Sequence, residues 1–100
     1  MTLSLHQEAL EVTDALEAQE LFFRNGWTDG LPVVPPTVNK IEAMLSAVPM
    51  DPQTIIGTIA ERGSTFSLEA VAVNSVMSGC LPEYFPVIVA TVSAICDPDF

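Results

Sequence analysis

Apolar residues recur with helical spacing in two stretches of the first half of this chain. The first stretch covers residues 15–23, with Thr13 as a candidate N-cap and with Gly26 suited to a left-handed C-terminal position. The second stretch follows Thr37, another good N-cap residue, and ends at Pro49, which cannot continue a helix. We therefore expect two amphipathic helices in this half.

The second half predicts two further helices that meet at a glycine. One begins at Ser67, is rich in Ala, Val and Met, and runs to about Ser78. It is apolar on most sides, which is typical of a helix buried deep in an assembly. Gly79 breaks it, and Pro82 suits the first turn of a fourth helix that is closed by Asp97-Pro98.

Between the helices the sequence predicts one strand and one proline-rich loop. Residues 53–60 are enriched in β-branched side chains, which favours a strand, and residues 62–64 are read as a loop. Residues 27–36 combine an Asp-Gly turn with three prolines. We expect an ordered loop or a short edge strand there, because its apolar side chains, Trp27, Leu31, Val33 and Val34, need burial.

These elements predict an α/β or α+β fold that is mostly helical and has few strands. With one predicted strand, a complete sheet would need pairing by residues 32–34 or strands from a partner. The 100 residues are expected to form a single domain or part of a larger interchain domain.

Composition points to a partner chain. Hydrophobic residues make up 49% of the sequence, yet 13 acidic residues face 3 basic ones, a net charge of −10. A domain this small leaves much apolar surface exposed if it stands alone, so we expect an obligate hetero-oligomer with a different protein chain. The shortage of Lys and Arg argues against nucleic acid and against anionic membrane surfaces as partners.

The sequence shows neither a membrane span nor an export signal, so a cytoplasmic location is expected. In that compartment the two cysteines, Cys80 and Cys96, are expected to be reduced thiols. They are separated by a whole helix, and His6 is the only histidine. The residues therefore predict no metal site in this chain and identify no cofactor.

Cys80 is the candidate for nucleophilic chemistry. It falls between two apolar helical stretches, at or just before the predicted start of the fourth helix, where free backbone amides stabilise a thiolate. Glu83 could serve as general acid or base or only cap the helix, and Tyr84 could donate its hydroxyl or only pack. The alternative for Cys80 itself is an inert core residue.

Three more residues are candidates for the same site. Asp29 could act as an acid or base if the loop that begins at Trp27 covers Cys80, although Asp before Gly is more often a turn residue. Asn74, among apolar neighbours, is expected to be a buried amide bound to backbone or substrate. Trp27 and Asn74 are the predicted substrate-binding residues.

Two blocks carry a family resemblance: residues 27–37 (W-T-D-G-L-P-V-V-P-P-T) and residues 72–87 (A-V-N-S-V-M-S-G-C-L-P-E-Y-F-P-V). They resemble those of a bacterial family similar to the companions of the UGSC group of selenocysteine- or cysteine-containing proteins. Proteins of this kind tend to carry thiol–disulfide oxidoreductase-type names. The U/C-Gly-Ser-Cys motif itself is absent here. The resemblance implies a small subunit whose partner supplies the rest, and it supports Cys80, Asp29, Glu83 and Tyr84 as neighbours in one site.

The sequence thus predicts a small subunit of a heteromeric thiol-dependent enzyme that acts on a small molecule, with Cys80 as nucleophile at a subunit interface. Two alternatives stay open. One is a cysteine-dependent hydrolase or lyase with Glu83 or Asp29 as general base, and the other is a non-catalytic structural subunit in which Cys80 only packs.

Overall fold

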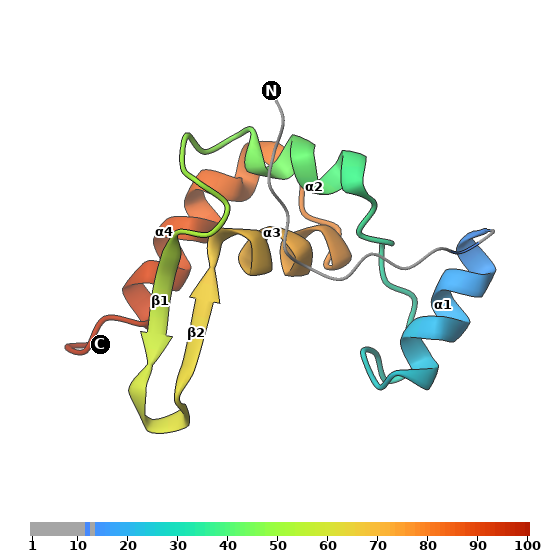
Figure 1. Ribbon diagram of the computed structural model, residues 1–100, viewed down its shortest axis with the longest axis horizontal. Helices are drawn as coiled ribbons and strands as arrows, with labels where there is room; N and C mark the ends of the chain where they lie inside the picture. The colour runs from blue at the N-terminus through green and yellow to red at the C-terminus, as the bar shows by residue number, and fades with distance from the viewer. Residues whose placement is uncertain (1–11, 13) are drawn as a thin grey trace.

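The computed structural model describes residue 12 and residues 14–100 of the chain, and Figure 1 shows that they form an α+β structure. The two strands are consecutive and antiparallel, so within these residues the fold is α+β and not an alternating α/β arrangement. The elements are α1 (Ala15–Arg24), α2 (Val38–Leu45), β1 (Ile55–Ile59), η1 (Ala60–Arg62), β2 (Ser64–Ser67), α3 (Leu68–Met77), η2 (Pro82–Tyr84) and α4 (Phe85–Ile95).

Helix α1 begins at a different cap from the one expected. The N-cap is Asp14, whose Oδ1 accepts a hydrogen bond from the backbone N–H of Glu17 at 2.8 Å, while Thr13 lies outside the described residues. The predicted stop is confirmed, since Gly26 follows the helix with φ of +71°. Figure 1 shows α1 standing apart from the other helices.

The proline-rich loop is ordered by hydrogen bonds but is not a strand. The side chain of Gln19 on α1 binds both backbone groups of Val33, at 2.6 and 3.1 Å, and the N–H of Val34 donates to the carbonyl of Met77 at 3.1 Å. The N–H groups of Val33 and Val34 are used in these bonds and Pro32 has none, so residues 32–34 form no ladder with β1. The expected burial of Trp27 and Leu31 is wrong, because their side chains are 51% and 69% exposed.

The predicted strand is confirmed as β1, but the sequence interpretation missed its partner. Residues 60–63 form a 3₁₀ turn that ends at Gly63 with φ of +62°, and the chain then returns as β2. The hairpin pairs Gly57 with Phe66 and Ile59 with Ser64. Its register shifts between Ile55 and Gly57, so Ile56 occupies a β-bulge.

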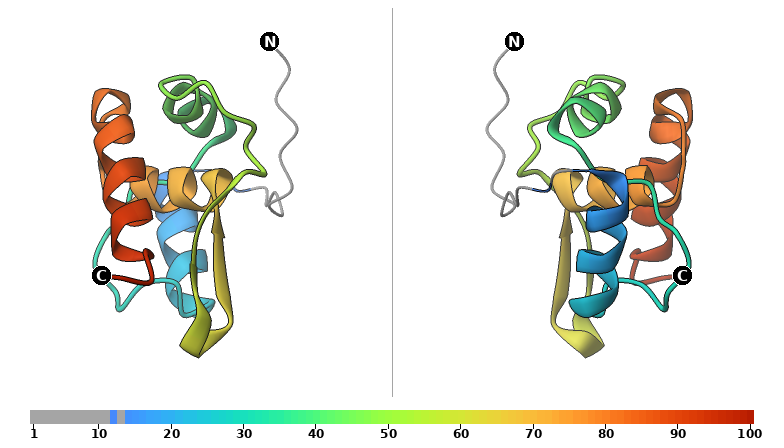
Figure 2. Two further views of the ribbon diagram at one scale, coloured as in Figure 1. Left: turned by 90° about the vertical axis from the view of Figure 1, so that its left-hand side faces the viewer. Right: turned by 90° about the vertical axis from the view of Figure 1, so that its right-hand side faces the viewer.

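Helix α3 lies at the centre of the core, between α2 and α4 (Figure 2). Its predicted N-cap is confirmed, since Ser67 Oγ accepts from the N–H of Ala70 at 3.1 Å. The predicted deep burial holds for Leu68 and Ala72, both fully buried, and Phe85 at the start of α4 is fully buried as well. The rest of the core comes mainly from α2, through Ile41, Met44, Leu45 and Val48.

A buried carboxylate fastens the N-terminus of α3 to the turn that precedes β1. Glu69 is 1% exposed, and its Oε1 accepts a hydrogen bond from Gln53 Nε2 at 3.2 Å. The backbone N–H groups of Leu68 and Glu69 donate to the carbonyls of Thr54 and Pro52, both at 2.8 Å. These bonds satisfy the free amides of the first turn of α3, so its position is fixed from this end.

The last helix starts later than the sequence suggested. Pro82 opens the short 3₁₀ turn η2, and α4 begins only at Phe85, with Pro86 in its first turn. The two prolines explain this, since each lacks an N–H and so suits the beginning of a helical segment. Within the described part of the chain, no helix has the length and apolar character needed to cross a membrane.

The C-terminal end of α4 reaches β1 at a glycine. A Cβ placed on Gly57 would lie 2.5 Å from Cys96 Cβ and 2.6 Å from Cys96 Sγ, so only glycine allows this approach. The contact holds α4 against the hairpin and so closes one end of the space between α3 and α4.

The contact between Gly57 and Cys96 determines whether a larger residue at position 57 stabilises or destabilises the protein. Gly57→Ala should lower the free energy of unfolding by about 1–3 kcal/mol, since the new methyl group overpacks the contact. At an open position with ordinary φ, the same change would instead stabilise the protein by about 0.4–1 kcal/mol. Urea denaturation at matched chain concentration measures the difference.

Matched variants at Cys96 separate this clash from a general effect of alanine in the strand. In a Cys96→Ser background the Cβ remains, so Gly57→Ala should cost as much as before. In a Cys96→Gly background the cost should largely disappear. An equal cost in both backgrounds would contradict the contact.

Candidate functional site

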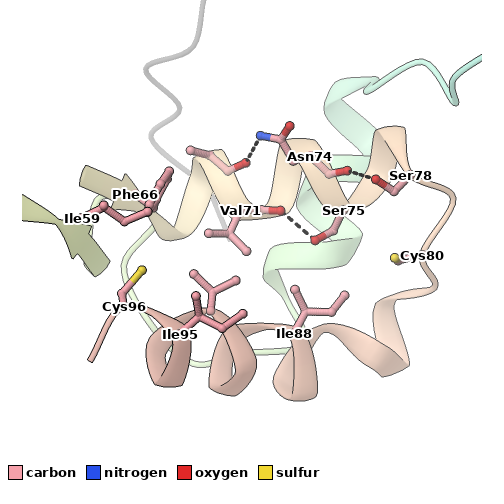
Figure 3. A pocket seen from close by; sticks show the side chains of 12 residues that line it. Ile59, Phe66, Val71, Asn74, Ser75, Ser78, Cys80, Ile88, Ile95 and Cys96 are labelled. Carbon is pink, nitrogen blue, oxygen red and sulfur yellow. Dashed lines mark hydrogen bonds between the residues drawn. The ribbon is translucent and has the colours of Figure 1, made fainter. Parts of the chain in front are cut away.

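A groove of about 530 Å³ lies between α3 and α4 (Figure 3). The two helices form its long walls, the hairpin closes one end, and the segment that follows α3 closes the other. Its lining residues are Ile59, Phe66, Ala70, Val71, Asn74, Ser75, Ser78, Cys80, Ile88, Val92, Ile95 and Cys96. None of them carries a formal charge, and most are apolar.

Helical spacing produces the two long walls. Val71, Ser75 and Ser78 are four and three residues apart and so share one face of α3. Residues 88, 92 and 95 repeat this spacing on α4. An apolar groove of this size with a few polar groups is typical of a site for a small organic molecule.

Cys80 lies at one end of this groove, partly buried, in the segment between α3 and η2. Gly79, with φ of +83°, turns the chain there, and the N–H of Cys80 donates to the carbonyl of Ser75 at 3.0 Å. Leu81 is the N-cap of η2. Cys80 therefore precedes this short turn. The expectation that Cys80 lies at the start of the long fourth helix is wrong, because α4 begins only at Phe85.

Cys96 lies at the opposite end of the groove, directly after α4 (Figure 3). Both cysteines are free thiols. The eleven residues of α4 between them span about 16 Å at 1.5 Å per residue, far beyond the reach of a disulfide. The sequence interpretation assigned no role to Cys96, although its helical spacing from Ile88 and Val92 was a usable signal for this shared face.

The polar side chains of the α3 wall hydrogen-bond to their own helix. Ser75 Oγ donates to the carbonyl of Val71 at 2.7 Å, and Ser78 Oγ donates to that of Asn74 at 2.9 Å. Asn74 Nδ2 donates to the carbonyl of Ala70 at 2.9 Å. The expected burial of Asn74 is wrong, because the residue is exposed at the rim of the groove. The serine oxygens keep lone pairs that can accept from a ligand.

The remaining candidates do not line this groove. Asp29 is exposed, and its Oδ1 accepts from the N–H of Leu31 at 3.2 Å, which is the turn role. Trp27 packs on Phe22 with ring centroids 5.9 Å apart. Glu83 and Tyr84 belong to the exposed turn η2. The structure thus places Asn74 beside the same groove as Cys80 and leaves the other four outside its lining.

In the described residues, no three His, Cys, Asp or Glu side chains gather in a way that could hold a metal ion. Comparison with protein-family models, curated proteins and solved structures finds no match for the chain. The resemblance to companions of the UGSC group therefore depends on the two sequence blocks alone.

The separation of the cysteines predicts how the chain responds to oxidation. A mild oxidant applied to the dilute chain should leave no intrachain Cys80–Cys96 disulfide, because α4 would have to unwind to bring the sulfurs together. Mass spectrometry of the unreduced, protease-digested chain provides the measurement. A dominant peptide pair joined through Cys80 and Cys96 would contradict the arrangement of the groove.

Proposed function

We propose that this chain is the small subunit of a heteromeric thiol-dependent enzyme of the cytoplasm, in which Cys80 is the nucleophile. The observation that carries the proposal is the position of Cys80 at one end of an uncharged, largely apolar groove. The lining favours an uncharged apolar molecule, which would lie along α3 and α4 with its reactive atom at Cys80.

Thiol–disulfide exchange fits this arrangement best. The Cys80 thiolate attacks one sulfur of an apolar disulfide, a new S–S bond forms, and the old S–S bond breaks to release a thiolate. A second thiol then attacks the mixed disulfide and restores Cys80. Cys96 stands at the far end of the groove, so this second thiol comes from the substrate or from the partner chain.

The groove lacks a charged partner for the thiolate among its own lining residues. All three basic residues of the sequence, Arg24, Lys40 and Arg62, belong to α1, α2 and η1. Among the residues that the structure describes, no basic side chain lines the groove, and we expect a partner to supply the cation or base that activates Cys80. This expectation supports a heteromeric enzyme.

The hydrolase or lyase alternative has less support. It needs a general base within hydrogen-bond reach of the nucleophile or the attacking water, about 2.6–3.2 Å or one water away. Neither Asp29 nor Glu83 lines the groove, and Asp29 is engaged in its own turn. The structural-subunit alternative remains the outcome if Cys80 proves inert.

The proposal predicts a saturable reaction of Cys80 with an apolar disulfide. With 2,2′-dithiodipyridine in excess, the rate of thiopyridone release at Cys80 should level off as the reagent fills the groove. A free thiol without a binding site reacts at a rate that stays linear in reagent concentration. Stopped-flow absorbance on the Cys96→Ser variant isolates the Cys80 reaction.

The matched variant Cys80→Ser keeps Cys96 alone and should react more slowly and without saturation, because Cys96 is held against β1 at Gly57. An anionic aromatic disulfide should react more slowly than the neutral one, since the chain carries a net charge of −10. Linear kinetics at Cys80, or equal rates for the two cysteines, would overturn the proposed function.

A further inference from the structure

Helix α4 lies at the edge of the molecule (Figure 2), and a second apolar surface is exposed along it. We call it the outer α4 face, and it consists of Pro86, Val87, Ala90, Thr91, Ala94, Ile95 and Phe100. These residues line a shallow groove of about 560 Å³. Val87 is 68% exposed and Phe100 is 85% exposed, values that are high for large apolar side chains.

The composition of this face favours contacts made by packing. Helix α4 contains no charged residue along its eleven positions. Its polar side chain Thr91 donates its hydroxyl hydrogen to the carbonyl of Val87 at 2.8 Å, inside the helix. Small side chains at 90, 91 and 94 leave room for another helix to approach closely between the larger residues.

Acidic residues flank the outer α4 face at both ends of the helix. Glu83 precedes the helix, Asp97 and Asp99 follow it, and all three are exposed. Asp97 has a turn role, since its Oδ1 accepts a hydrogen bond from the N–H of Asp99 at 2.8 Å. The carboxylate of Asp99 opposes the helix dipole, which favours cations at this end, so helix stability does not explain it. The three basic residues of the sequence lie on other elements.

We propose that the outer α4 face is the docking surface for an amphipathic helix of a different chain, one with an apolar stripe and basic residues at both ends. The stripe would bury Val87, Ile95 and Phe100, and the basic ends would pair with Glu83 and Asp99. This surface is distinct from the groove at Cys80, and the inference stands whether or not Cys80 is a nucleophile.

The same charges argue against a second copy of this chain as the occupant. In an antiparallel pair of α4 helices, Glu83 of each copy would face the acidic C-terminal residues of the other. In a parallel pair, each acidic end would face its equivalent. Both arrangements bring like charges together, which is unfavourable and disfavours self-pairing.

The probe is a dye-labelled synthetic peptide of about 15 residues, long enough to form a helix on binding, with a Leu/Ala stripe and Lys at both ends. Fluorescence anisotropy against the full chain measures its affinity. Ala90→Arg, in the middle of the face, should weaken binding by about tenfold or more. The matched control, Ala43→Arg on an exposed position of α2, should change it by less than about threefold.

Charge-reversal variants test whether basic residues at the ends of the partner helix pair with Glu83 and Asp99. The double variant Glu83→Lys with Asp99→Lys should bind the Lys-ended peptide about fivefold more weakly than the parent chain does. It should bind a Glu-ended peptide more tightly. The control variant Glu20→Lys with Glu61→Lys changes the net charge by the same amount at distant exposed positions. It should change the affinity for either peptide less. Cys80→Ser should bind the peptide as the parent chain does.

Three results would overturn the inference. One is equal binding of the Lys-ended and Glu-ended peptides, and another is undiminished binding by Ala90→Arg. The third is a dimer of the chain, seen by light scattering at the same concentrations, that Ala90→Arg converts to monomer, because a second copy would then be the occupant.

Discussion

The burial of α3 is the constraint on which the rest of the structure depends. At its N-terminus, the amides of Leu68 and Glu69 bind the turn before β1, and at its C-terminus the carbonyl of Met77 accepts from Val34 of the proline loop. Two distant segments are thus fastened to one helix by backbone hydrogen bonds. With both ends held, α2 and α4 pack on its sides, and the groove at Cys80 is the space that α3 and α4 leave between them.

Much of the fold could be predicted from local signals. The N-caps Thr37 and Ser67, the turn at Gly26 and the strand before Ala60 are encoded within a few residues, and the structure confirms them. β2 could not be recognised in this way, because Ser64–Ser67 is short and polar and becomes a strand only by pairing with β1. The exposure of Trp27 could not be predicted either. An apolar side chain indicates that burial is favourable, but it does not identify the residues that would cover it.

The sequence predicted the types of residue in the site better than it predicted where their side chains lie. Cys80 was chosen because a thiol beside a helix start can react, and it does line the groove, although two prolines delay α4 until Phe85. Asn74 was assigned to the core from its neighbours in sequence, yet helical rotation carries it to the surface. Cys96 was passed over because it is distant in sequence from Cys80, whereas the two thiols face one groove from opposite ends. The difference at Asn74 arises from where its side chain points, which depends on the phase of α3 and not on composition.

Helix α4 contributes residues both to the groove at Cys80 and to the outer α4 face. Ile88 and Val92 belong to the groove at Cys80, Val87 and Ala90 belong to the outer α4 face, and Ile95 lines both. An uncharged helix with apolar residues on opposite sides is unstable as an exposed element, because a single packed side does not remove enough apolar area from water. Gly57 allows the close approach of Cys96, so the C-terminal end of this helix lies against the hairpin. A partner packed on the proposed docking surface would contact Ile95, which also lines the groove, so the two proposals share this residue.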